Sequence, residues 1–195
     1  MASGIVFKSL AAAGIGAFAE SKFSPMVFAA PKDGSVSPLY FATPTVLLGV
    51  GFFALMHGMR VGAARKKYAE LAKKDGEKDA DERYGLPNLY VDGNSKHARA
   101  FNTIQRSHQH IFETFPSVIL GGLIGAYQFP ITTALSTLLY ASGRIALSKA
   151  YADSEGDPAK RYDNPLSQYT WYGLLMKFIL GFASAFMTMS TIQFA

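Results

Sequence analysis

The feature that most constrains this chain of 195 residues is the uneven distribution of its charges. No Asp, Glu, Lys or Arg occurs between Asp33 and Arg60, between Glu113 and Arg144, or after Lys177. Each gap is long enough for a helix that crosses a bilayer, which needs about 20 mainly apolar residues. Because soluble domains carry charges at shorter intervals, this pattern indicates an integral membrane protein.

Composition narrows the functional classes further. Hydrophobic residues make up 49% of the chain and charged residues only 17%, which argues against disorder. The absence of cysteine excludes disulfides, thiolate metal sites and a cysteine nucleophile, so any thiol chemistry must come from a substrate. The net charge of +5 comes from cations that cluster beside apolar spans, which favours membrane topology and argues against a nucleic-acid partner.

The apolar segments predict an all-α fold, an integral membrane four-helix bundle. The four helices are expected at about residues 43–62, 97–127, 131–152 and 166–191. Phe129-Pro130 predicts a tight hairpin between the second and third helices, and residues 70–93 are expected to be a solvated connection. We therefore place a four-helix domain at residues 43–195, preceded by an amino-terminal segment at residues 1–42.

The amino-terminal segment has two open interpretations. A small-residue run after Lys8 contains Ala17-Phe18-Ala19, which resembles a signal-peptidase site, so the segment is either a cleaved targeting peptide or a retained interfacial segment. The cations lie mainly in residues 60–99 and around residues 149–161, which places both loops in one compartment. The endoplasmic reticulum is the favoured membrane, with mitochondrial and plastid membranes as alternatives.

A stripe of polar residues marks the second helix. Asn102, Arg106, Gln109 or His110, and Glu113 follow steps of three and four, so they share one helical face. Ionisable residues on a membrane helix are costly and normally face protein or a water-filled cavity. This face therefore predicts a polar pocket.

Cations of the other helices are expected at the same depth. Arg144 on the third helix precedes Tyr151 by two turns, which places both side chains on one face. Further cations follow the first and third helices, namely Arg65, Lys66, Lys160 and Arg161. Such a set suits a ligand with two carboxylates, an ammonium for Glu113 and an ionisable sulfur, and glutathione has these features. Lys177, near the middle of the fourth span, has Glu113 or an acid of another subunit as its possible partner.

A family resemblance follows from these residues. The sequence from Phe101 to Gln109, with Glu113 and Pro116, resembles the second-helix signature of the MAPEG family, the membrane-associated proteins of eicosanoid and glutathione metabolism. It is most similar to the type-3 microsomal glutathione transferase branch. The resemblance extends to Ala64-Arg65-Lys66-Lys67-Tyr68 and to Gly143-Arg144, and it covers about residues 45–195.

The resemblance implies a homotrimer that binds glutathione between neighbouring subunits. By positional match the tripeptide would be held by Arg106 and Glu113, joined by Arg65 or Lys66, Arg144 and Tyr151. Arg161 or Lys160 would activate the thiol. The chain also departs from the family pattern, with His110 where an asparagine is usual and Leu147 where a tyrosine is usual. His110 is either a substitute hydrogen-bond donor or an inert replacement.

Two functional hypotheses follow. The first is a membrane-bound glutathione transferase or glutathione-dependent lipid peroxidase, with glutathione as co-substrate and membrane lipids as surroundings. The second is a non-catalytic subunit of a larger membrane complex that keeps the family fold. His57, His97 and His108 lack partners at metal-ligand spacing, so we assign no metal.

Overall fold

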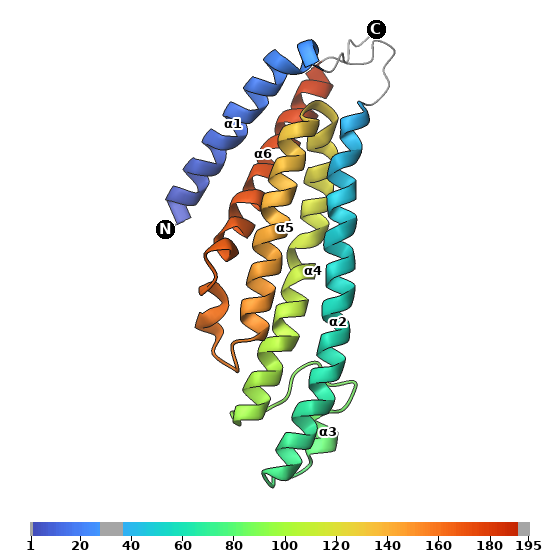
Figure 1. Ribbon diagram of the computed structural model, residues 1–195, viewed down its shortest axis with the longest axis vertical. Coiled ribbons are helices and arrows are strands. Elements are labelled where there is room, and N and C mark those ends of the chain that lie inside the picture. The colour runs from blue at the N-terminus through green and yellow to red at the C-terminus, as the bar shows by residue number, and fades with distance from the viewer. Residues whose placement is uncertain (1, 28–36, 191–195) are drawn as a thin grey trace. The chain divides into compact units, whose positions relative to one another are not determined.

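The computed structural model describes residues 2–27 and 37–190, and these residues form helices without any strand (Figure 1). The elements are α1 (Ala2–Val27), η1 (Pro38–Phe41), α2 (Ala42–Lys74), α3 (Ala80–Tyr84), α4 (Lys96–Gln128), α5 (Pro130–Ala152), η2 (Pro158–Tyr162), η3 (Pro165–Gln168) and α6 (Tyr169–Ser190). The η elements are short 3₁₀ helices. The all-α prediction is confirmed.

The predicted membrane helices correspond to α2, α4, α5 and α6. Two segments of the described chain, Pro38–Lys74 and Pro165–Ser190, are long and apolar enough to cross a bilayer. Helix α4 has 33 residues and α5 has 23, so both have the length to cross, but both are more polar than α6. Polar residues in such helices face other protein segments, which makes α4 and α5 the places to search for a site.

Besides the four expected membrane helices, the described residues form two further α-helices, α1 and α3. Helix α2 continues 12 residues beyond Gly62, because the segment after it is rich in Ala, Lys, Glu and Leu, which favour helices. The expected solvated connection contains the short helix α3, and Tyr84 at its end is only 1% exposed. Tyr84 packs in a cluster with Ala72, Val91 and Phe101, so this connection shares an apolar core with α2 and α4.

The chain divides into two compact units, which are described separately. The first contains the described residues of Met1–Val50, Thr114–Gly143 and Gln168–Ala195, and the second contains Gly51–Glu113 and Arg144–Ser167. In the first unit, α4 and α6 approach closely at Gly121 and Gly181, where an added Cβ on Gly181 would lie 3.2 Å from the Gly121 Cα. Small residues at such crossings are typical of packed membrane helices.

Helix α1 belongs to the first unit and packs against α6 (Figure 1). Ala13 is buried against Phe129 and Leu180. Glu20 is only 7% exposed, and its two carboxylate oxygens accept hydrogen bonds of 2.8 Å from the backbone N–H groups of Ile131 and Thr132. These amides are at the first turn of α5 and have no partner within the helix, so Glu20 caps α5 from another element.

Candidate functional site

The polar face of α4 lies in the second unit and carries an ion pair. The guanidinium of Arg106 donates two hydrogen bonds to the carboxylate of Glu113, one of them 3.1 Å long. The two side chains lie two turns apart on the same face, as the sequence spacing predicts. They are 38% and 40% exposed, so the pair is accessible to a ligand.

His110 joins this ion pair to α5. Its Nε2 atom lies 4.0 Å from Glu113 Oε2, and its Nδ1 atom accepts a hydrogen bond of 3.0 Å from Arg144 Nη1. The same guanidinium lies 3.4 Å from the carbonyl oxygen of His110. Arg144 has no exposed surface, whereas His110 is partly exposed. We name the four side chains Arg106, Glu113, His110 and Arg144 the α4 network.

Burial separates the roles of the two arginines. Arg106 is accessible, whereas Arg144 is buried and donates to the imidazole of His110, whose other nitrogen lies 4.0 Å from Glu113. Without a rearrangement of these helices, a ligand on this face would touch Arg106, Glu113 and the accessible part of His110. Leu147, at the position where the family usually has a tyrosine, is fully buried.

The loop before α4 places a residue beside the network that sequence reasoning missed. Asn102 donates a hydrogen bond of 2.8 Å to the Val91 carbonyl oxygen and accepts one of 2.9 Å from the Val91 N–H. This clamp holds the neighbouring Tyr90, whose hydroxyl donates to the side-chain oxygen of Gln109. Tyr90 lies outside the α4 motif in sequence. The sequence could have indicated its position only if the hydrogen bonding of Asn102 to the backbone of the preceding loop had been foreseen.

The basic residues of α2 are engaged in different ways. Arg65 donates a hydrogen bond of 2.7 Å to the Tyr84 carbonyl oxygen, and its guanidinium lies 4.7 Å from the ring centre of Phe101. Lys66 is exposed and lines a cavity of about 280 Å³. The other lining residues are Arg65, Ala69, Glu70, Lys73, Asp81, Tyr84 and Gly85. Burial raises the pKa of the Tyr84 phenol.

The turn after α5 contains the two cations predicted to activate a thiol. Arg161 lies in η2, donates a hydrogen bond of 2.7 Å to the Pro158 carbonyl oxygen, and stands 6.0 Å from the ring centre of Tyr151. Lys160 is exposed. The turn therefore brings Arg161 and Tyr151 together.

The three remaining histidines have partners other than a metal. His57 hydrogen-bonds Ser107 at 2.7 Å, His97 pairs with Asp75 at 2.8 Å, and His108 packs against the ring of Phe112. No group of three or more His, Asp or Glu side chains suited to a metal occurs among the described residues.

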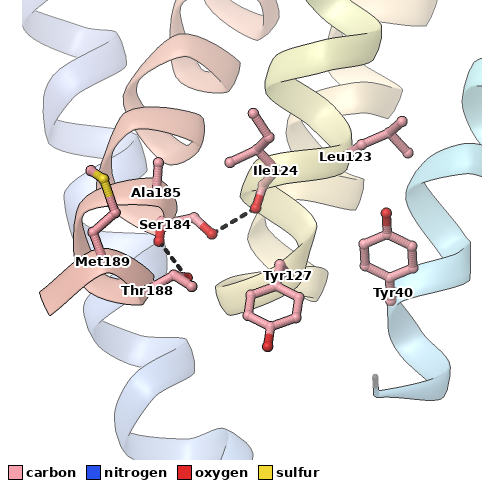
Figure 2. Close-up of a pocket in the computed structure, with 8 residues that line it drawn as sticks. All are labelled: Tyr40, Leu123, Ile124, Tyr127, Ser184, Ala185, Thr188 and Met189. Atoms are coloured by element: carbon pink, nitrogen blue, oxygen red, sulfur yellow. Dashed lines mark hydrogen bonds between the residues drawn. The ribbon is translucent and has the colours of Figure 1, made fainter. Parts of the chain in front are cut away.

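An apolar cavity of about 620 Å³ lies in the first unit, between η1, α4 and α6. Figure 2 shows its lining residues, Tyr40, Leu123, Ile124, Tyr127, Ser184, Ala185, Thr188 and Met189. The Ser184 hydroxyl donates to the Ile124 carbonyl oxygen at 2.6 Å, and the Thr188 hydroxyl donates to the Ser184 carbonyl oxygen at 2.9 Å. Because these polar groups bond within the protein, the cavity suits an apolar guest.

Comparison with known proteins identifies a family. Residues 41–183 match the model of the MAPEG family, a range that contains the whole α4 network and leaves α1 outside. No solved structure matches the chain.

Proposed function

Because the chain belongs to the MAPEG family and is an integral membrane helical bundle, we propose that it binds glutathione at the α4 network and presents the thiol to a lipophilic reactant. The observation that carries the proposal is the accessible ion pair of Arg106 and Glu113. In a free α-amino-acid group, one carboxylate and one ammonium are attached to the same carbon atom. Such a group can take over the pair, with its carboxylate on Arg106 and its ammonium on Glu113.

The γ-glutamyl end of glutathione carries this group. The exchange replaces the Arg106–Glu113 ion pair with two ion pairs, one from each residue to the ligand. Each charge that loses water on binding therefore gains a partner of opposite charge. His110 would stay in place because Arg144 fixes its ring from the buried side. In this proposal Arg144 is therefore a positioning residue, and Arg65 or Lys66 together with Tyr151 would complete the contacts to the tripeptide.

The thiol would be activated electrostatically. A guanidinium or ammonium near the sulfur favours the thiolate, and we assign this role to Arg161, with Lys160 as the alternative. In conjugation, the thiolate forms a bond to an electrophilic carbon and a leaving group departs. In peroxide reduction, two glutathione molecules become the disulfide while a lipid hydroperoxide becomes an alcohol and water. We further propose the type-3 microsomal branch, a homotrimer and the endoplasmic reticulum membrane.

Binding of glutathione by the purified protein in detergent tests this proposal. We expect Arg106→Gln to weaken binding about tenfold, because it removes a charge-assisted hydrogen bond to a carboxylate. Glu113→Gln should weaken the binding of glutathione about equally, but it should not weaken the binding of an analogue without the α-ammonium, which has no group that pairs with Glu113. Lys149→Gln, an exposed charge change on α5, is the control. Equal affinity for glutathione and that analogue in the unchanged protein would refute the assigned binding mode.

A non-catalytic role is the second candidate. The observation that favours it is that His110 and buried Leu147 replace the usual asparagine and tyrosine, and that His110 is already engaged by Arg144. A protein of this kind would bind no glutathione and turn over neither a general electrophile nor a fatty-acid hydroperoxide. It would also remain with other membrane proteins after mild solubilisation. Turnover by an isolated homotrimer would exclude this role.

A further inference from the structure

A second pocket of the second unit lies at the junction between apolar and charged parts of α2. It has a volume of about 630 Å³ and is separate from the α4 network. Its lining residues are Arg60, Ala63, Ala64, Lys67, Tyr68, Ile104, Ala152, Asp153 and Glu155. The lining combines two cations, two acids and an apolar floor, which is the composition expected for an amphipathic ligand.

The charges of this pocket leave one cation and one acid available. Arg60 donates a hydrogen bond to Asp153, so these two neutralise each other. Lys67 and Glu155 are exposed, and neither forms an ion pair with any residue of the described chain. The open part of the pocket is therefore complementary to a zwitterion that has one anionic and one cationic group.

The backbone of Glu155 is held in place by the turn that carries it. Glu155 has a φ of 53°, in the left-handed region that few residues other than glycine adopt. The next residue, Gly156, has a φ of 94° and lies so close to α4 that an added Cβ would be 2.8 Å from the Arg99 Cβ. The buried Ser154 hydroxyl donates to the Tyr151 carbonyl oxygen at 2.7 Å. A strained residue in a well-fixed turn is typical of a functional position.

An apolar track leads into the pocket along α2. Phe52, Met56 and Met59 are 65%, 48% and 65% exposed, and they precede Ala63 and Lys67 at steps of three and four on the same face. The track from Phe52 to Lys67 is about 22 Å long, at a rise of about 1.5 Å per residue. An acyl chain along this track would place its head group beside Lys67.

From these observations we propose that the pocket binds a phospholipid with a primary-ammonium head group. Its phosphodiester would lie at Lys67, next to the Arg60–Asp153 pair, and its ammonium would donate to Glu155. The acyl chain would follow Phe52, Met56 and Met59. A head group with a quaternary ammonium has no N–H to donate to Glu155, and one without a cation leaves that acid uncompensated. Both should therefore bind less tightly.

Native mass spectrometry of the full chain after removal of lipid tests the proposal. The probes are phosphatidylethanolamine, phosphatidylcholine and phosphatidylglycerol with identical acyl chains. We expect phosphatidylethanolamine to bind about fivefold more tightly than the other two, the magnitude of a partly exposed charge pair. Lys67→Gln should weaken all three lipids by about the same factor. Lys149→Gln, an exposed lysine outside the pocket, should weaken none.

The Glu155 variant separates this site from general lipid adhesion. Glu155→Met, which removes both the charge and the hydrogen-bond acceptor, should abolish the preference for phosphatidylethanolamine over phosphatidylcholine and leave phosphatidylethanolamine bound. A preference that survives this change would overturn the proposal, as would equal affinities in the unchanged protein or tightest binding of phosphatidylglycerol. Full competition by soluble phosphoethanolamine would also overturn it, because the ligand would then be a free zwitterion and not a lipid.

Discussion

Two regions of this protein each contain a basic side chain without any exposed surface, and they hold it in different ways. Arg144 in the second unit donates to His110, which lies 4.0 Å from the carboxylate of Glu113. Lys177 in the first unit donates to the hydroxyl of Thr137 and forms no ion pair with the described residues. One buried cation is thus connected to an acid through a polar network, and the other is solvated by a hydroxyl.

The two buried cations therefore differ in how far their surroundings compensate the free energy of desolvation. Removing a charge from water costs several kcal/mol, and nearby opposite charge repays more of that cost than a single hydroxyl does. The network around Arg144 is therefore expected to stabilise the second unit, whereas Lys177 is expected to destabilise the first. Mutation of the two cations should have effects of opposite sign.

The largest expected effect is that of Arg144→Leu. This change leaves His110 without its donor on the buried side and leaves space where the guanidinium was, so we expect a loss of about 3 kcal/mol in unfolding free energy. Denaturant unfolding of the purified protein in mild detergent measures it. Lys149→Leu on the exposed side of α5 is the control, with little expected change. A loss as small as in the control would contradict the structural importance of the network.

The same contrast shows what the sequence could predict. Steps of three and four predicted that Arg106, His110 and Glu113 share a face, because helical periodicity is a local property. The contact of His110 with Arg144 depends on the rotation of α5 against α4, which is set by packing and is not encoded in either helix alone. For the same reason, Glu113 could only be suggested from the sequence as a possible partner of Lys177. In the structure Lys177 donates to Thr137, and Glu113 accepts from Arg106.

Elements without a strong pattern were also missed. Helix α1 is docked by Glu20 on the α5 amides, a contact between positions 111 and 112 residues apart in sequence. Helix α3 has only five residues, too few to show periodicity in a charged segment. Long apolar helices could be predicted from length and composition, whereas these tertiary contacts could not.

Lys177→Met should have the next largest effect, with the opposite sign. The methionine side chain has a similar length and no charge to desolvate, so we expect stability to rise by about 1 to 2 kcal/mol. Thr137→Val provides a second measurement, because loss of the hydroxyl should destabilise the unchanged protein and cost much less in the Lys177→Met background. Lower stability of Lys177→Met would show that the ammonium has stronger partners than this hydroxyl.

Glu20→Gln tests a buried acid whose partners are backbone groups. The carboxylate caps two amides at the start of α5 and interacts favourably with the helix dipole. Replacing it with a neutral amide should therefore lower the free energy of unfolding by about 1 kcal/mol. Thermal unfolding in detergent measures this cost, with Lys22→Gln on the exposed side of α1 as the control. If Glu20→Gln and Lys22→Gln unfold alike, α1 is not anchored through this acid.

The smallest effect is expected at the exposed cluster of Asp75, Lys96 and His97. Hydrogen bonds from Lys96 and His97 lower the pKa of Asp75 below its ordinary value of 3.8. A carboxyl group with a lowered pKa in the folded state stabilises the protein above its unfolded pKa, and this contribution is lost as the pH falls through the folded value. The difference in unfolding temperature between the unchanged protein and Asp75→Asn should therefore shrink as the pH falls below about 4. Since the cluster is exposed, salt should also reduce this difference, whereas the effects of Arg144→Leu and Lys177→Met should depend little on salt. A difference that grows as the pH falls would mean that Asp75 is destabilised, not stabilised, by its neighbours.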